Sequence, residues 1–282
     1  MPSKLRRENW NMSIKHALKQ RIVLLAVKFI VDVLFKKAPP CTVLYDGKDV
    51  DAFSVGKGGF QSGVVTQHCT SHLFEGDFNS AFKKATCGSL IRFDGNFNRE
   101  RFYFTCKLGK IAGATKGDFI FVGVSWGIAA YTVLEYTKSK SEFYFVDKWD
   151  GSIPSQGEGK KNSTYCRDIR LLQERFKKFS NVNYIVGHVP ECLPEISSKR
   201  IAFMHFDIGL PDAAMATIEA LWPRIVEGGI VVLDSFSMGE REDRHVYLNG
   251  LKKLKGQFEI LNTLGGMAAI IKLPAMKTTA RP

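Results

Sequence analysis

The sequence predicts an α/β fold built on a doubly wound, mostly parallel sheet of seven strands, preceded by an N-terminal helical and cap region. Two observations carry this prediction. From residue 117 onward, short apolar runs typical of buried strands alternate with segments typical of helices, which indicates parallel strands joined by helical crossovers. The last two apolar runs, 258–264 and 267–273, have no helix between them, so they predict an antiparallel hairpin that closes the sheet.

Each element of this sheet has a local signal of its own. Runs rich in aromatic and β-branched residues predict five further strands, at 118–124, 142–147, 182–187, 201–207 and 229–236. Longer segments beside these strands predict helices, at 127–139, 163–179, 212–226 and 245–256. A stretch rich in Gly and Ser, 150–163, predicts a loop after the second strand.

The first 110 residues lack this alternation. Apolar residues recur every three or four positions over 13–37 and predict one amphipathic helix, which Pro39 and Pro40 end. Three interpretations of this helix stay open. It could dock on the main domain, pair with a second copy in a homodimer, or contact an anionic membrane at its surface. Residues 41–110, rich in Gly, Phe and polar side chains, predict short helices and loops that form a cap.

Charge and cysteine usage narrow the function classes. Residues 1–40 carry nine Lys or Arg against two acids, which is +7 of the net charge of +12. The body of the chain is therefore only mildly basic, and no specific nucleic-acid partner is expected.

Six scattered cysteines without a C-x-x-C pair predict reduced thiols and a cytoplasmic location. We expect no cleavable signal peptide, and the apolar run 21–35 is too short to span a bilayer.

The chain is accordingly expected to have four parts. They are a basic amphipathic helix (1–40), a cap that selects the substrate (41–110), the main α/β domain (111–275) and a flexible tail (276–282).

Ligands of doubly wound sheets bind at the carboxyl ends of the strands, so the residues at those ends are the first candidates for a site. Gly123 and Gly127 follow the first strand and predict a tight turn that lets the backbone approach a ligand closely. Asp147 ends the second strand, 24 residues after Gly123, and a carboxylate there suits the hydroxyls of a ribose. The alternative is that these are ordinary loop residues.

Two more acids, Asp207 and Asp234, end the fourth and fifth strands. If these strands are neighbours, about 5 Å apart, the two carboxylates face one another and repel unless a cation or a proton lies between them. Mg²⁺, which prefers oxygen ligands, is the natural candidate. The alternative is that each acid caps the helix or turn after it, and Asp212 is a candidate N-cap for the helix that follows.

Four blocks, in this order along the chain, resemble the macrocin O-methyltransferase family of class I S-adenosylmethionine-dependent methyltransferases. They are KGDFIFVGVSWGIAA, FVDKWDGSIP, FMHFDIGLPDA and LWPRIVEGGIVVLDSF. The resemblance runs from 99 to 272, about 60% of the chain, and the terminal hairpin is typical of the class I sheet. Many members of this family methylate sugar hydroxyls.

The resemblance implies an S-adenosylmethionine-dependent O-methyltransferase that acts on a hydroxyl of a sugar, a glycoconjugate or a related small molecule. It implies cofactor contacts from residues at the strand ends: Gly123, Val124, Gly127, Asp147, Lys148, Gly187, His188 and Asp207. It also implies a Mg²⁺ ion that orients the acceptor, held by Asp207, Asp234 and Ser235.

Three positions depart from the family pattern. Phe121, Gly209 and Ser235 stand where the family usually has acids, and Gly209 replaces the candidate general base. A sugar hydroxyl is a poor nucleophile unless a base removes its proton, an effect worth roughly 10²- to 10⁴-fold.

His205 and Asp212 are therefore the candidate catalytic bases, with His188 and His245 as further substitutes. Two other functions stay open. One is a catalytically degenerate methyltransferase-like protein that serves as a binding or scaffold module. The other is a nucleic-acid methyltransferase, although no sequence block for a flipped base is present.

Overall fold

The computed structural model describes residues 43–45, 48–50, 59–61, 64–66, 71–74, 76–87, 99–151, 165–236, 241–263 and 266–275. The chain separates into two compact units, Met1–His72 and Leu73–Pro282. The predicted N-terminal helix at 13–37 and the tail at 276–282 lie outside the described residues, as does most of the predicted loop at 150–163.

The described residues of the first unit include two short antiparallel hairpins. Strand β1 (Val43–Tyr45) pairs with β2 (Lys48–Val50), and β3 (Gly59–Gln61) pairs with β4 (Val64–Thr66). These strands correct the prediction of helices and loops alone for the range 41–110. Each is three residues long, which is too short for a strand pattern to stand out in the sequence.

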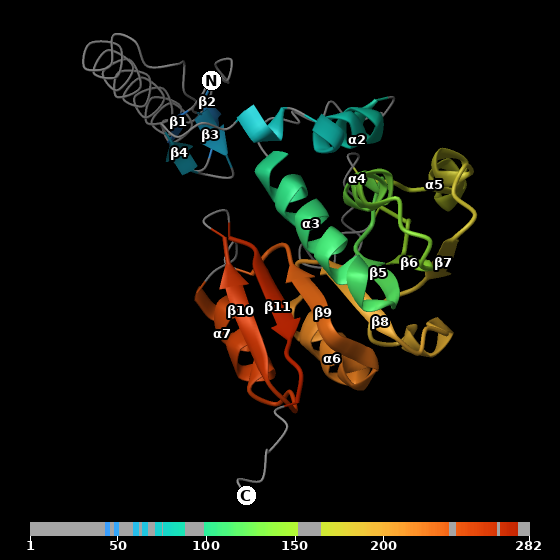
Figure 1. The fold of residues 1–282 in the computed structure, drawn as a ribbon, viewed down its shortest axis with the longest axis vertical. Helices are drawn as coiled ribbons and strands as arrows, with labels where there is room; N and C mark the ends of the chain where they lie inside the picture. Colours follow the sequence, from blue (N-terminus) through green and yellow to red (C-terminus); the bar gives the residue numbers. More distant parts are fainter. Residues whose placement is uncertain are drawn as a thin grey trace, which may run out of the picture. The chain divides into compact units, whose positions relative to one another are not determined.

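The second unit contains one seven-stranded sheet with helices on both faces (Figure 1). Its strands are β5 (Asp118–Val122), β6 (Phe143–Asp147), β7 (Val182–Val186), β8 (Ile201–Phe206), β9 (Ile225–Leu233), β10 (Phe258–Asn262) and β11 (Ala268–Lys272). Its α-helices are α2 (Gly76–Thr86), α3 (Arg99–Ala112), α4 (Ile128–Thr137), α5 (Ile169–Phe176), α6 (Pro211–Leu221) and α7 (Arg241–Leu251).

The strand order confirms the predicted sheet. It runs β10-β11-β9-β8-β5-β6-β7, and the five strands from β9 to β7 in this order pair in parallel. Strand β11 pairs antiparallel with both β9 and β10, so the terminal hairpin inserts its last strand in reverse. The chain order changes direction beside β5, which places the ends of β5 and β8 at the crevice where such sheets bind ligands.

Two apolar cores fix the sheet between its helices. On one face, α6 and α7 supply Ala214, Met215, Ile218, Leu221, Tyr247 and Leu251. On the other face, α2, α3, α4 and α5 pack against an aromatic layer from the sheet: Phe119, Phe121, Phe143, Phe145 and Phe203. Strands covered on both faces are mostly apolar, and β8 is buried at all six positions with His205 as its polar residue.

A buried carboxylate joins the helices of the second face. Glu135 of α4 accepts hydrogen bonds from Lys84 of α2 at 3.0 Å, from Lys138 at 3.0 Å, and from Lys178 just after α5. Burial acts to raise the pKa of Glu135, but the three lysines outweigh it and lower that pKa to about 2. Helix α2 and helix α4 are thereby tied together, and α2 belongs to the same unit as the sheet.

Two element boundaries differ from the sequence prediction. Helix α5 begins at Ile169 rather than at 163, because the side chain of Asp168 caps it by accepting from the main-chain N–H of Arg170 at 2.9 Å. Helix α6 has Leu210 at its N-cap and Pro211 at its first position, so Asp212 lies in the first turn and is not the predicted cap.

Among the residues that the structure describes, no helix combines the length and the apolar character needed to cross a bilayer.

Candidate functional site

The turn between β5 and α4 is held in an uncommon backbone conformation. Gly123, Ser125 and Gly127 have φ values of 80°, 48° and 70°. A Cβ atom on Gly123 would lie 2.2 Å from the main-chain oxygen of Asp207, and one on Gly127 would lie 2.6 Å from the ring of Phe176. The glycines therefore let the turn contact the end of β8 on one side and α5 on the other, which confirms the predicted tight turn.

Asp147, at the end of β6, organises this turn. One carboxylate oxygen accepts from the main-chain N–H of Ser125 at 2.7 Å, and the other accepts from Lys148 at 2.6 Å and Trp149 at 3.3 Å. The indole N–H of Trp149 donates in turn to the main-chain oxygen of Ser125 at 3.2 Å. A carboxylate has about four lone-pair sites, so about one remains for a ligand.

A cavity of about 330 Å³, called here the larger cavity, opens over the ends of β5, β6, β7 and β8. Its lining includes six of the residues that the sequence predicted for the site: Asp147, Lys148, Gly187, His188, Asp207 and Ser235. Gly187 donates its main-chain N–H to the main-chain oxygen of Asp147 at 3.0 Å. This bond holds the ends of β6 and β7 in register beneath the cavity.

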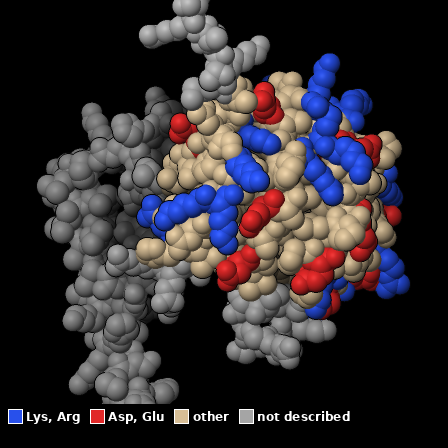
Figure 2. Space-filling model, turned by 90° about the horizontal axis from the view of Figure 1, so that it is seen from below, with Lys and Arg blue, Asp and Glu red and all other residues tan. Residues whose placement is uncertain are grey.

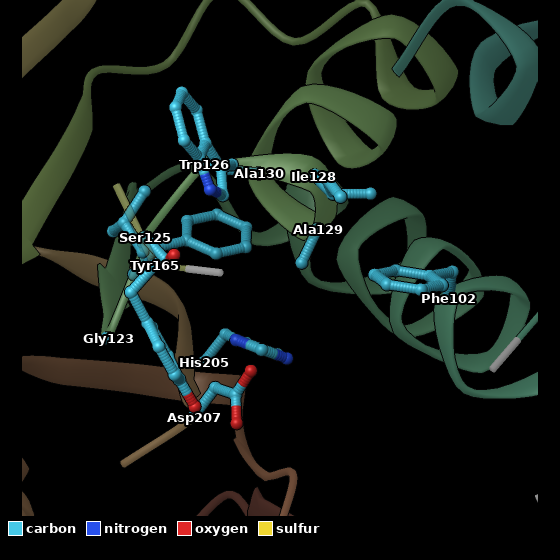
Figure 3. A pocket seen from close by; sticks show the side chains of 12 residues that line it. Phe102, Gly123, Ser125, Trp126, Ile128, Ala129, Ala130, Tyr165, His205 and Asp207 are labelled. Atoms are coloured by element: carbon cyan, nitrogen blue, oxygen red, sulfur yellow. The ribbon is translucent and has the colours of Figure 1, made fainter. Parts of the chain in front are cut away.

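A second cavity of about 250 Å³, the smaller cavity, lies between the β5–α4 turn and helix α3 (Figure 3). Its walls are largely aromatic and aliphatic, with Phe102, Phe121, Val124, Trp126 and Ile128 among the lining residues. Its polar side chains include His205 and Asp207, which Figure 3 shows on the side of the strand ends. The two cavities share four lining residues, namely Gly123, Ser125, Tyr165 and Asp207.

The register of the sheet brings Asp207 and Asp234 to adjacent strand ends, as predicted. Phe206 of β8 pairs with Leu233 of β9, and the main-chain N–H of Asp234 donates to the oxygen of Phe206 at 2.9 Å. Burial raises the pKa of Asp207, and Asp234 raises it further, while Arg101 opposes both. Because the cavities admit water to the exposed Asp207 side chain, solvent screening limits the size of this rise.

His205 is almost fully enclosed, with 4% of its surface exposed, and its ring centroid lies 5.4 Å from that of Phe121. Burial lowers its pKa; Asp234 acts in the opposite direction and Arg101 in the same direction. A lowered pKa keeps the imidazole neutral at physiological pH, which is the form that accepts a proton.

Asp234 has a cationic partner that the sequence did not predict. The guanidinium of Arg101, from the first turn of α3, contacts the Asp234 carboxylate at 2.5 Å and 3.3 Å and also donates to its main-chain oxygen. Asp234 lines neither cavity.

The residues present do not fit the magnesium site that the family resemblance implies. Both carboxylate oxygens of Asp234 are engaged by Arg101, Ser235 offers one hydroxyl, and Gly209 offers no side chain. Within the described part of the chain, no group of three or more His, Cys, Asp or Glu side chains is arranged to hold a metal ion. The predicted ligand set of Asp207, Asp234 and Ser235 is therefore not assembled around a common cation position.

The other predicted residues lie in different places. Val124 lines the smaller cavity rather than the larger one, and Gly127 lines neither, although it shapes the turn. Asp212 and His245 are exposed and line neither cavity, so neither is positioned as a base for a ligand held there.

Sequence reasoning missed several residues that build the site. Arg101 and Phe102 reach it from α3, whose sequence carries no motif, and Tyr165 lies inside the predicted helix 163–179 but before the observed start of α5. Ser125 is the one missed residue with a signal in the sequence. It stands between the turn glycines Gly123 and Gly127, and this position favours a further residue with positive φ.

Replacing Asp207 by asparagine is expected to stabilise the protein above neutral pH. A carboxyl group whose pKa is higher in the folded state than the ordinary value of 3.8 disfavours folding as the pH rises above that value. Asparagine removes this effect. Thermal unfolding should therefore show a higher Tm for Asp207→Asn than for the natural protein at pH 8, and the gain should vanish toward pH 4. A gain of equal size at both pH values would contradict this assignment.

Part of the sequence and the overall fold resemble known methyltransferases. The model of a family described as "Methyltransferase domain" matches residues 120–236. A comparison with curated proteins finds no match. Among solved structures, the O-methyltransferase NovP superposes with a TM-score of 0.54 at 17% sequence identity, over 63% of this chain and 81% of NovP.

Two further solved structures are similar at lower TM-scores. CalS11, a TDP-rhamnose 3'-O-methyltransferase, has a TM-score of 0.47 at 15% identity, over 69% of this chain and 92% of CalS11. The Podospora anserina methyltransferase PaMTH1 has a TM-score of 0.46 at 12% identity, over 73% of this chain and 94% of PaMTH1. The main unit thus has the α/β fold of the O-methyltransferase NovP, and residues 120–236 are similar to the methyltransferase-domain family.

Proposed function

We propose that the protein is an S-adenosylmethionine-dependent O-methyltransferase that binds its cofactor in the larger cavity and its acceptor in the smaller one. The observation that carries this proposal is the junction of the two cavities at Gly123, Ser125, Tyr165 and Asp207. A group transferred from one ligand to the other needs such a shared boundary, because reacting atoms must approach to about 3–3.5 Å.

The larger cavity suits a nucleoside. Asp147 keeps about one lone-pair site for a ribose hydroxyl, and Gly187 and His188 line the wall where an adenine ring would lie. S-adenosylmethionine, when bound, supplies an electrophilic methyl group on a sulfonium centre. The glycine turn excludes side chains from this wall and lets the backbone approach the ligand.

The smaller cavity suits an acceptor with one apolar face and one hydroxyl group. Aromatic and aliphatic side chains form most of its lining, while His205 and Asp207 supply polar groups, a division typical of pockets that orient a small molecule. A hydroxyl of a sugar, a glycoconjugate or a related small molecule is the acceptor that we propose. Neutral His205 would take the hydroxyl proton as the methyl group arrives.

Substitution of His205 by asparagine tests this role. Methyl transfer should fall by roughly 10²- to 10⁴-fold, the contribution of a positioned base, while affinity for S-adenosylmethionine stays unchanged. The assay follows labelled methyl groups from S-adenosylmethionine to a panel of sugars, sugar nucleotides and phenols. His245→Asn is the matched control, because His245 is exposed and lines neither cavity, and it should retain full activity.

Cofactor binding without transfer to any member of the panel would favour the alternative, a methyltransferase-like binding or scaffold protein. The specific observation behind this alternative is the absence of a carboxylate at Gly209 and Ser235. Equal transfer by the His205 variant and the natural protein would reject His205 as the base but keep the enzyme assignment.

Nucleic acid is not the acceptor that we propose. On the face of the molecule in Figure 2, lysine and arginine side chains are spread among acidic ones rather than gathered in one stripe.

The four cysteines that the structure describes, Cys87, Cys106, Cys166 and Cys192, are free thiols. This agrees with the reducing cytoplasmic compartment that forms part of the proposal.

A further inference from the structure

We propose that Arg101 is a built-in cation at the strand-end site, occupying the position of the divalent metal ion that the family resemblance implies, so that the site works without a metal. The inference concerns the carboxylates of Asp207 and Asp234 and the guanidinium of Arg101, which contacts Asp234 from α3. It rests on the proposed function only for the statement that the site works without a metal.

The contacts of Arg101 are those of a structural cation rather than a surface charge. Its side chain is 8% exposed and that of Asp234 is 17% exposed. Two nitrogens of the planar guanidinium address the two carboxylate oxygens, at 3.3 Å and 2.5 Å, and one of them also donates to the main-chain oxygen of Asp234. This bidentate, largely desolvated arrangement is the strong form of an arginine–carboxylate pair.

The charge of Arg101 reaches the other groups of the site. Its positive charge acts to lower the pKa of Asp207 and that of His205, although burial is the larger effect on both groups. Two facing carboxylates would otherwise repel one another, and a cation between them relieves that repulsion. Arg101 neutralises Asp234 by direct contact, and its positive charge favours the ionised form of Asp207.

A divalent ion would compete with Arg101 for the same oxygens. Mg²⁺ requires near-octahedral oxygen ligands at about 2.0–2.1 Å, and an ion bound to Asp234 would lie against the positive guanidinium. The remaining side chains do not compensate, because Gly209 has none and Ser235 supplies one neutral hydroxyl. The arginine and the metal therefore exclude each other at this position.

The decisive experiment removes the arginine and measures metal binding rather than catalysis. Arg101→Ala removes the cation beside Asp234. Mn²⁺ should then bind with a Kd at least about tenfold below 1 mM, measured by titration calorimetry and by the rise in Tm that Mn²⁺ causes. The natural protein itself should show no saturable Mn²⁺ binding up to about 1 mM.

Three further variants make the result specific. Arg101→Ala combined with Asp234→Asn should lose the gained Mn²⁺ binding, because one of the two freed carboxylates is gone. Arg101→Lys should show no gain, because the ammonium keeps a positive charge at the site. Arg99→Ala should also show none: Arg99 is buried in the same helix, but it donates to the main-chain oxygen of Leu73 and to Asn79, both at 2.9 Å.

Two results would overturn the proposal. One is saturable Mn²⁺ binding by the natural protein that Asp234→Asn abolishes, and the other is a folded Arg101→Ala variant that gains no affinity. If Arg101→Ala fails to fold, the spectrum of free Mn²⁺ titrated with the natural protein still decides, because bound Mn²⁺ loses its sharp electron-spin resonance signal. None of these readouts needs methyl transfer, so failure of the proposed function leaves this test intact.

Discussion

Gly123→Ala is expected to destabilise the protein by about 3 kcal/mol or more and to abolish cofactor binding. The methyl group would lie 2.2 Å from the main-chain oxygen of Asp207 and 2.8 Å from a side-chain carbon of Ile208, so the turn and the end of β8 would have to separate. The strand ends frame both cavities, and a shift there displaces the walls of each.

The cost of positive φ has to be separated from the cost of this close approach. Gly256 offers the matched control, because it also has positive φ (91°) but a Cβ atom there meets nothing within 4 Å. Gly256→Ala should cost only the conformational strain of an L-residue, about 1 kcal/mol. Chemical denaturation of both variants measures the difference. Equal losses of stability would mean that the contact between Gly123 and Asp207 has no structural importance.

Asp147→Asn is expected to weaken binding of S-adenosylmethionine by about 100-fold, which corresponds to about 2.7 kcal/mol. The carboxylate receives three main-chain N–H groups, from Ser125, Lys148 and Trp149. An amide nitrogen in place of either oxygen points its own N–H groups at a donor, so at least one charge-assisted hydrogen bond is lost. The turn of Ser125 then shifts, and the acceptor for the ribose is lost with it.

A nearby acid controls for charge alone. Asp150 forms an ion pair with Lys148 at 3.5 Å, and both side chains are about 40% exposed. Exposed pairs contribute about 0–1 kcal/mol, so Asp150→Asn should change cofactor affinity by less than about threefold. Comparable losses for the two variants, measured by calorimetry at the same pH, would argue that net charge rather than the geometry of Asp147 governs binding.

The sheet was predictable from the sequence because its signal is local and redundant. Five strands and the terminal hairpin are apolar runs bounded by turn residues, and a strand covered on both faces has no alternative to being apolar. The placement of Asp207 and Asp234 at adjacent strand ends followed from this, because adjacent parallel strands end at the same edge. The short strands β1 to β4 gave no comparable pattern, since three residues do not define a period.

The cation at the site was not predictable from the sequence. Arg101 is separated from Asp234 by 133 positions, and one arginine among 40 basic residues carries no sign of its partner. Only the packing of α3 against β8 and β9 brings the two together. The family resemblance implied a metal because it transfers the ligand positions. The charge that neutralises Asp234 comes from α3, which lies outside the four sequence blocks that carry the resemblance.

Calorimetric titration of the full chain with S-adenosylmethionine tests the central claim most directly. We predict saturable binding at one site, with micromolar affinity that is the same with and without Mg²⁺. S-adenosylhomocysteine, the product of methyl transfer, should compete for this site. Absence of binding at millimolar S-adenosylmethionine, from protein whose melting transition shows that it is folded, would contradict the assignment.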